Sequence, residues 1–465
     1  MAASTAEPRS TDRYLGEDSA SRSLYERALD VMPGGNSRHT LVMDPYPIYA
    51  ASGHGCVVTD VEGQERIDFV NNYTSLILGH SHPAVTEAVA RVIGSGTAFS
   101  LPTETDIRLA ELLVERIPYI DQVRFANSGS EGVLLAIRAA RAATGRSKIA
   151  KFEGCYHGIY DYAQASDSSR PKNWGESERP ATTLEPSMAK SLETEVVTLP
   201  LNDIEVCGAL IDEHRDDLAA VLMDPLPAAL GLIPPKADFV AAIRAKTREC
   251  GALLIADEVL SFRIDYRGAC HRFGIEPDLV SLGKIIGGGF PVGAVAGKAD
   301  VMAVFDHRDG ELVHHGGTYN GNPVTMVAGY ETMKRLTPDV FDEFDRLGDR
   351  VRAGLQQVLR RHGVEAVATG RGSLFAAVPG NEPPKDFRAV FTARSAVPQL
   401  QKIALEMLNR GMLMGARGLF GALSTPMGDA EIDRFLEAAD GAAHWVRGSS
   451  DPPRATPRSG GARTK

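Results

Sequence analysis

Short, mostly apolar runs recur through the middle of the chain, and two of them lead to a charged residue. One run covers residues 253–255 and leads to Asp257, and the other covers residues 279–282 and leads to Lys284. Runs this short are typical of strands buried on both faces of a parallel sheet. Ligands of open α/β sheets bind at the carboxyl ends of the strands, so the pattern places Asp257 and Lys284 at a candidate site.

The same pattern predicts two lobes. Helical stretches alternate with strand candidates from about residue 80 to 335, which indicates an α/β lobe with a mostly parallel sheet. Longer amphipathic helices follow, and with the N-terminal region they are expected to form a smaller lobe. The strand candidates are 219–223, 253–256 and 292–296, and the later helices are 351–361, 397–409 and 429–443. The expected bounds are a disordered N-terminus at 1–20, small-lobe segments at 21–80 and 336–447, a large lobe at 81–335 and a disordered tail at 448–465.

Composition narrows the class of protein. A chain of 465 residues is too long for one ordinary core, and 43% apolar with 24% charged residues is typical of a soluble globular protein. The net charge of −10 argues against a nucleic-acid partner. No apolar run approaches the roughly 20 residues that span a bilayer, and residues 1–20 have no apolar stretch, so no secretory signal is expected. Five scattered cysteines suit buried thiols, so we expect a cytoplasmic protein.

Lys284 and Asp257 carry the first chemical signal. A lysine at a strand end, followed by a glycine-rich turn at residues 287–289, is a candidate amine for forming an imine with a cofactor. An aspartate at a neighbouring strand end is what pyridoxal phosphate (PLP) requires beside its pyridinium nitrogen. The alternative is that Asp257 caps a turn and Lys284 is a solvated surface lysine.

A second signal lies at the start of a predicted helix within residues 125–146. Ser128, Gly129 and Ser130 precede its apolar positions, and Gly145 closes it as a C-terminal cap. Free backbone N–H groups among small residues at a helix start suit a phosphate group. An ordinary serine N-cap gives the same pattern, so these residues alone leave both interpretations open.

Two loops give weaker signals. Tyr156 could stack on a planar ring, and His157 could equally pack or form hydrogen bonds. The loop of residues 314–323 holds Thr318 among glycines and amides, and it could approach a phosphate or form an ordinary turn. No histidine pair has a convincing third ligand, so no metal site is expected.

In this order and spacing, the segments resemble the class III aminotransferases of PLP fold type I. The branch that they resemble contains glutamate-1-semialdehyde aminomutases and β-amino-acid (β-phenylalanine) aminotransferases. The matching stretches are MPGGNSRHT (32–40), LGHSHPAV (78–85), ANSGSEG (126–132), AIRAARAATGRSKIAKFEGCYHG (136–158), LLIADEV (253–259), PDLVSLGKIIGGGFPVGAVAGK (277–298) and HHGGTYNGNP (314–323). The resemblance implies an α/β fold with a mostly parallel, seven-stranded-type sheet in the large domain and a smaller α+β domain from both chain ends.

The resemblance also implies roles for single residues. Lys284 would hold PLP covalently and then move a proton, and Asp257 would keep the pyridinium nitrogen protonated. Thr318 would reach the phosphate from a neighbouring subunit, so the expected active unit is a homodimer. The other implied cofactor contacts are Ser128, Gly129 and Ser130 at the phosphate, Val259 beneath the ring, Tyr156 above it, and His157.

One stretch departs from the family pattern. Family members often carry an amide in the run that follows the strand before Asp257, and this chain reads DPLPAA at 224–229. Ala229 stands where the amide would contact the phenolic oxygen of PLP. The hydrogen bonding of that oxygen is therefore left open.

Arg38 and Arg417 are candidate anchors for substrate carboxylates. An arginine fork binds a carboxylate through two parallel, charge-assisted hydrogen bonds, whereas the alternative for each is a surface salt bridge. We assign Arg38 to the side nearest the phosphate and Arg417 to the opposite side, and the two could be exchanged. The aminomutases tend to carry an acidic residue where this chain has Leu419, and an arginine followed by glycine resembles the β-amino-acid aminotransferases more closely.

These features favour an aminotransferase that moves the amino group of a β-amino acid, expected to be aromatic, to a keto acid such as 2-oxoglutarate or pyruvate. A covalently held cofactor implies a ping-pong mechanism. The alternative enzyme is a glutamate-1-semialdehyde aminomutase, an isomerase that needs no second substrate. A catalytically silent module of the same fold would be expected to lack the lysine or to carry a DNA-binding segment. This sequence retains Lys284, and residues 1–20 are too short and too acidic to bind DNA.

Overall fold

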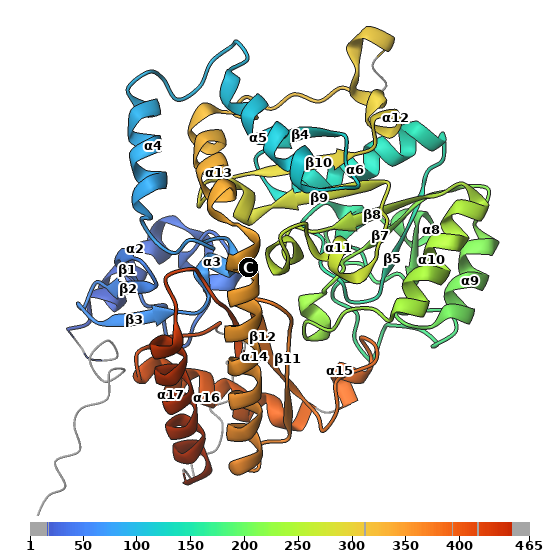
Figure 1. Cartoon of the computed structure of the whole chain (residues 1–465). Helices are drawn as coiled ribbons and strands as arrows, with labels where there is room; N and C mark the ends of the chain where they lie inside the picture. The colour runs from blue at the N-terminus through green and yellow to red at the C-terminus, as the bar shows by residue number, and fades with distance from the viewer. Residues whose placement is uncertain (1–15, 17, 311–312, 393, 416–417, 449–465) are drawn as a thin grey trace, which may run out of the picture.

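The computed structural model describes residues 16, 18–310, 313–392, 394–415 and 418–448, and its centre is a seven-stranded sheet (Figure 1). The strand order is β4-β10-β9-β8-β7-β5-β6. Six strands run parallel to one another, and β10 alone runs antiparallel to its neighbours β4 and β9. The strands are β4 (Gln122–Ala126), β5 (Lys148–Phe152), β6 (Val196–Leu199), β7 (Leu218–Met223), β8 (Leu253–Asp257), β9 (Leu279–Gly283) and β10 (Gly293–Gly297). The expected α/β fold is confirmed, with a mixed sheet.

Helices cover both faces of this sheet, which explains why its central strands β7, β8, β9 and β10 are mostly apolar. Ile255 and Leu279 lie in the core cluster that includes α6, whereas Leu254 and Val280 lie in the cluster that includes α5, α9 and α10. Alternate residues of a strand point to opposite faces, so a strand between two helical layers needs apolar residues at every position. The covering helices are α5 (Glu104–Arg116), α6 (Gly129–Thr144), α9 (Ile204–Glu213) and α10 (Ala237–Cys250).

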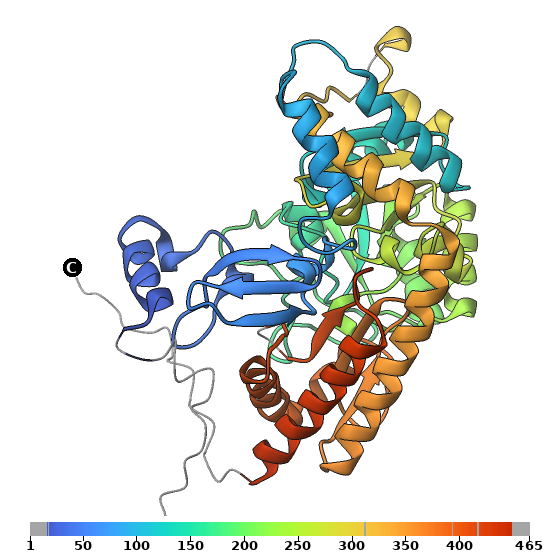
Figure 2. The same cartoon turned by 60° about the vertical axis from the view of Figure 1, so that its left-hand side comes forward.

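Two smaller sheets lie beside long C-terminal helices (Figures 1 and 2). β13 runs parallel to β3, which joins the two ends of the chain in one sheet. The helix expected at 397–409 is confirmed as α16, and Gly448, expected in the tail, is instead the last residue of α17. The elements are β1 (Ala50–His54), β2 (Val57–Asp60), β3 (Glu65–Asp68), β13 (Met412–Leu413), β11 (Ala366–Thr369), β12 (Leu374–Pro379), β14 (Phe420–Ala422), α14 (Pro338–Arg361), α16 (Val397–Asn409) and α17 (Asp429–Gly448).

The remaining helices flank these sheets. α13 packs against α4 and α5 on the side of the large sheet, and α2 projects beside β1 and β2 (Figure 2). None of the helices in the described part of the chain combines the length and apolar character that crossing a membrane takes. All five cysteines are buried free thiols, as expected. The helices are α2 (Ala20–Val31), α3 (Asn71–Thr74), α4 (Pro83–Ile93), α7 (Asp161–Gln164), α8 (Leu192–Glu195), α11 (Ala269–Phe273), α12 (Ala299–Met302), α13 (Pro323–Arg335) and α15 (Ala389–Thr392).

Candidate active site

Lys284 and Asp257 lie at the same edge of the seven-stranded sheet. Asp257 is the last residue of β8, and Lys284 directly follows β9, the parallel neighbour of β8. Asp257 is buried and Lys284 is partly buried. Loss of solvation lowers the pKa of the Lys284 amine, and the negative charge of Asp257 opposes part of that shift. A lowered pKa brings the lysine closer to the neutral amine that acts as a nucleophile.

The glycine-rich turn after Lys284 packs closely against α13. At Gly288, where φ is +60°, an added Cβ atom would lie 2.3 Å from the carbonyl oxygen of Ala328. At Gly329 on α13, an added Cβ atom would lie 2.1 Å from the carbonyl oxygen of Ile286. Neither position has room for a side chain, so the backbone that carries Lys284 is tightly held. Lys284 itself has a φ of +48°, and non-glycine residues in this left-handed region cluster at functional sites.

His157 is hydrogen-bonded to Asp257. Its Nδ1 atom lies 2.8 Å from Oδ2 of Asp257, and the other oxygen of Asp257 accepts the backbone N–H of Val259 at 3.1 Å. Burial lowers the pKa of His157, so the neutral ring donates its Nδ1 proton to the carboxylate. Its buried Nε2 atom has no partner among the described residues. The structure therefore resolves the two interpretations of His157 in favour of hydrogen bonding.

Asp224 is a third carboxyl group at this sheet edge, and the sequence did not single it out as a site residue. It directly follows β7 and is buried, and its Oδ1 atom accepts the backbone N–H of Leu226 at 2.8 Å. Burial and the nearby charge of Asp257 raise its pKa well above the usual range. The strand ends thus bring a second buried carboxyl group close to Asp257, and burial favours the protonated form of Asp224. The signal that identified Asp257, a polar residue after an apolar strand, applies equally to Asp224.

The start of α6 adjoins the same sheet edge. Ser128 is the N-cap, its hydroxyl accepts a backbone N–H of the first turn at 3.2 Å, and Gly145 ends the helix in the left-handed conformation, as expected. An added Cβ atom on Gly129 would lie 2.7 Å from Cγ1 of Val259, and one on Gly293 would lie 1.8 Å from the carbonyl oxygen of Ser128. Small residues are therefore needed for packing. The partly exposed helix start still offers free backbone N–H groups to an anion.

The loop that carries Tyr156 lies on the start of α6. The Ser130 hydroxyl accepts the backbone N–H of Ile159 at 3.2 Å, and a Cβ atom on Gly158 would lie 2.3 Å from that hydroxyl oxygen. Tyr156 is 58% exposed, although its neighbour His157 is buried. The loop thus presents the accessible Tyr156 ring next to His157, the hydrogen-bond partner of Asp257. Stacking on a cofactor ring requires such an accessible position.

Thr318 lies on an exposed loop that is also tied to the start of α6. The side-chain amides of Asn127 and Asn320 are hydrogen-bonded at 2.6 Å, and Asn127 directly precedes the N-cap Ser128. Thr318 itself is exposed. Its expected reach into a neighbouring subunit stays a prediction.

Arg38 is exposed and hydrogen-bonded to a neutral side chain. Its Nη2 atom donates to Oδ1 of Asn72 at 2.8 Å, and its Cζ atom lies 5.7 Å from the ring centre of Tyr73. No carboxylate in the described part of the chain lies within ion-pair distance of it. The salt-bridge alternative therefore finds no support at Arg38. Arg417 lies outside the described residues.

This set of groups fits PLP. A buried carboxylate fixed by a neutral histidine can hold a proton on a pyridinium nitrogen, and a partly buried lysine amine on the next strand can bind an aldehyde carbon. The helix start suits the phosphate group. No cluster of three or more metal-ligating side chains occurs within the ranges that the structure describes.

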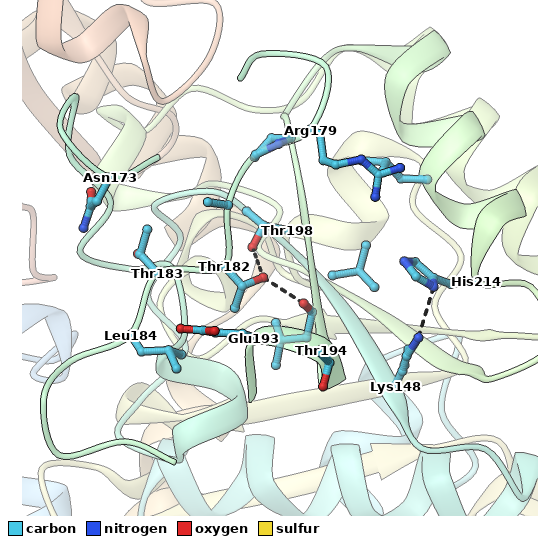
Figure 3. Close-up of a pocket in the computed structure, with 15 residues that line it drawn as sticks. Lys148, Asn173, Arg179, Thr182, Thr183, Leu184, Glu193, Thr194, Thr198 and His214 are labelled. Atoms are coloured by element: carbon cyan, nitrogen blue, oxygen red, sulfur yellow. Dashed lines mark hydrogen bonds between the residues drawn. The ribbon is translucent and has the colours of Figure 1, made fainter. Parts of the chain in front are cut away.

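A hollow of about 790 Å³ at the β6 edge of the sheet is separate from these residues (Figure 3). It contains none of the expected site residues, and its cations already have partners. Lys148 lies 3.2 Å from His214 and 2.9 Å from Asp217, and Arg179 pairs with Glu213. The chemistry of the strand ends, and not the size of this hollow, identifies the candidate site.

Comparisons with known proteins show which family this chain resembles. The family model described as aminotransferase class-III matches residues 42–436. A glutamate-1-semialdehyde 2,1-aminomutase from Geobacillus kaustophilus is 38% identical over 92% of this chain and 99% of its own length.

Solved structures add two transaminases. An omega-transaminase from Sphaerobacter thermophilus is 49% identical, with a TM-score of 0.91 over 94% of this chain and 99% of that one. A β-phenylalanine aminotransferase from Variovorax paradoxus is 36% identical, with a TM-score of 0.81 over 91% of this chain and 93% of that one.

Proposed function

This chain belongs to the class III aminotransferases, which use PLP, and from that membership we propose that it moves the amino group of a β-amino acid to a keto acid. The observation that carries a carboxylate-bearing substrate is the environment of Arg38. Its guanidinium is held by a neutral amide and is left without a carboxylate among the described residues. A fixed, unpaired guanidinium is suited to bind the carboxylate of a substrate.

PLP, when bound, supplies an electron sink that allows the C–H bond beside the amino group to break. In our proposal, Lys284 holds the cofactor and its Nζ atom carries the proton between the substrate carbon and the cofactor. Asp257, oriented by His157, keeps the pyridinium proton in place. The backbone at Ser128, Gly129 and Ser130 binds the phosphate, while Val259 and Tyr156 lie against the two faces of the ring. In the proposed homodimer, Thr318 completes the phosphate site of the partner.

Two further observations support a transaminase of β-amino acids. The omega-transaminase and the β-phenylalanine aminotransferase are similar to this chain over nearly their whole length. Leu419, at the place where the aminomutases tend to carry an acidic residue, is buried at 1% exposure. A buried leucine cannot supply a charged group to a substrate, so this aminomutase feature is absent. An aromatic donor and 2-oxoglutarate or pyruvate as acceptor complete the proposal.

The second candidate is a glutamate-1-semialdehyde aminomutase, because two relatives of that name are 38% and 41% identical to this chain. Both reactions begin by breaking the same kind of bond at the same cofactor. They differ in whether the keto product leaves, so an aminomutase turns over without any amino acceptor.

Two arginine variants test carboxylate binding. A transaminase must accept two different acids in one site, so we expect Arg38→Ala and Arg417→Ala each to raise the Michaelis constant for the donor or the acceptor by about 10-fold or more, as loss of a charge-assisted pair implies. Steady-state kinetics with both substrates varied measures this. Unchanged Michaelis constants for both substrates in Arg417→Ala would show that the two-anchor arrangement is wrong.

A further inference from the structure

The four residues of the short element α3, Asn71–Thr74, form a left-handed turn next to Arg38. Their φ angles are +50°, +47°, +53° and +74°, so four successive residues other than glycine lie in the left-handed region. Asparagine tolerates this conformation, but tyrosine and threonine rarely adopt it. Such a run persists only where surrounding contacts over-determine it, and it points to a functional constraint on the backbone.

Buried hydrogen bonds lock both ends of the turn. At the start, Oδ1 of Asp68 accepts the backbone N–H of Asn71 at 2.9 Å, and Nδ2 of Asn71 donates to the carbonyl oxygen of Ala422 at 2.7 Å. At the end, Nη1 of Arg263 donates to the carbonyl oxygen of Thr74 at 2.7 Å. The two ends are thus bound to β14 and to the segment that follows β8.

Arg263, which holds the end of the turn, is unusual because it is a fully buried cation with no carboxylate partner among the described residues. Its other donors bind the Ser373 hydroxyl at 2.9 Å and the carbonyl oxygen of Leu423. Burial lowers its pKa to about 9. Arg263 is six residues beyond Asp257 in the chain, so it ties the turn to the segment that carries Asp257.

The turn holds Arg38 through Asn72. An arginine can only donate, so the Asn72 side chain must present its oxygen, and that oxygen accepts from Nη2 of Arg38 at 2.8 Å. The amide nitrogen of Asn72 donates to the Ser75 hydroxyl at 3.1 Å, which fixes the orientation of the amide. The Tyr73 ring lies near the guanidinium, and its hydroxyl donates to the carbonyl oxygen of Thr40.

The same segment borders the turn that follows Lys284. A cavity of about 220 Å³ is lined by Ser75 and Leu76 on one side and by Gly288 and Gly289 on the other. An added Cβ atom on Gly289 would lie 2.9 Å from Cδ2 of Leu76. Arg38 is thus hydrogen-bonded to a segment that packs against the loop of the candidate catalytic lysine.

We propose that Asn72 is a specificity-determining positioning residue, which holds the Arg38 guanidinium toward a substrate carboxylate without neutralising it. The inference rests on the proposed role of Arg38 and adds a requirement for a neutral hydrogen-bond acceptor at position 72. An aspartate there would accept the same hydrogen bond but would also pair with the arginine and compete with the substrate. Asparagine tolerates the left-handed backbone conformation at position 72, and its side-chain oxygen reaches Arg38.

The test compares Asn72→Asp with Asn72→Gly in the PLP-loaded enzyme. Aspartate and glycine both accept a φ of +47°, so neither variant adds backbone strain. The probe is 3-phenylpropanoate, a carboxylate that cannot be transaminated, and 3-phenylpropan-1-ol is its neutral counterpart. Dissociation constants are measured by calorimetry, so turnover is not needed. Asn202→Asp is the matched control, because Asn202 is another left-handed asparagine, with its side chain bonded to Lys236 and Lys385.

We expect Asn72→Asp to weaken binding of the carboxylate by about 10-fold or more and Asn72→Gly by about 2- to 5-fold, in line with charged and neutral hydrogen bonds. Neither variant should change binding of the alcohol, Asn202→Asp should change nothing, and Asn72→Asp should have no further effect when Arg38→Ala is present. Equal losses in the two Asn72 variants, persistence of the aspartate effect without Arg38, or a wild type that does not prefer the carboxylate would each overturn the inference. A wild type that binds the carboxylate but never transfers the amino group of a β-amino acid would overturn the proposed function alone.

Discussion

Lys284→Ala is expected to lower turnover by at least about 1,000-fold, because loss of a positioned proton carrier alone costs 10²- to 10⁴-fold. The variant also loses the amine that would hold PLP covalently. The visible absorption band of the lysine-bound cofactor should therefore disappear together with turnover. Steady-state assays and absorbance spectra of the purified, PLP-loaded protein measure both effects.

A matched control for this variant is Lys298→Ala, which removes a lysine from the same family-matching stretch. Lys298 lies 3.5 Å from Asp121 in an exposed ion pair, and such pairs contribute little to stability. We expect this control to keep both activity and the absorption band. Turnover in Lys284→Ala within 10-fold of wild type would contradict the proposed role of Lys284 as the residue that holds PLP and carries the proton.

Asp257→Asn is expected to have the second largest effect, a loss of about 100-fold or more in kcat, as removal of one preorganised electrostatic partner implies. Asparagine has one accepting oxygen in place of two, so it can keep the His157 hydrogen bond but not also that of the Val259 N–H, and it has no negative charge to hold a pyridinium proton. Because the side chain keeps its shape, the loss should fall mainly on kcat, and the free energy of unfolding should drop by only about 1–3 kcal/mol. Kinetics and a thermal melt of the same preparation separate the two effects.

Asp224→Asn provides the contrast at the neighbouring strand end. Burial beside Asp257 raises the pKa of Asp224 well above its usual range, which favours its neutral form. Its replacement by a neutral amide of the same shape should therefore cost less than about 10-fold. Equal losses in the two variants would contradict the different roles given to Asp257 and Asp224.

Much of the fold and of the candidate site could be predicted from the sequence, because the informative signals are local. The strand at 253–256 and the helix after Ser128 follow from apolar pattern and capping residues, and the structure confirms both as β8 and α6. The placement of Lys284 beside Asp257 follows from the rule that parallel strands end at one sheet edge. The resemblance to the class III aminotransferases then strengthened the prediction that the cofactor is PLP.

Other features depend on contacts between distant segments, which no local pattern encodes. The antiparallel direction of β10 is one, since residues 293–297 are as apolar as their parallel neighbours. The left-handed turn at Asn71–Thr74 is another, because its residue types do not favour that conformation and Arg263, nearly 190 residues away, helps to hold it. The hydrogen bond between His157 and Asp257 spans 100 residues.

The most direct test of the central claim is a half-reaction without any keto acid. The yellow, PLP-loaded protein is mixed with 3-amino-3-phenylpropanoate, and its absorbance spectrum is followed. Our account expects the band of the lysine-bound cofactor to give way to that of the aminated cofactor, and addition of 2-oxoglutarate or pyruvate to reverse the change. No spectral change with this donor, combined with turnover of glutamate-1-semialdehyde in the absence of any acceptor, would contradict the account and identify an aminomutase.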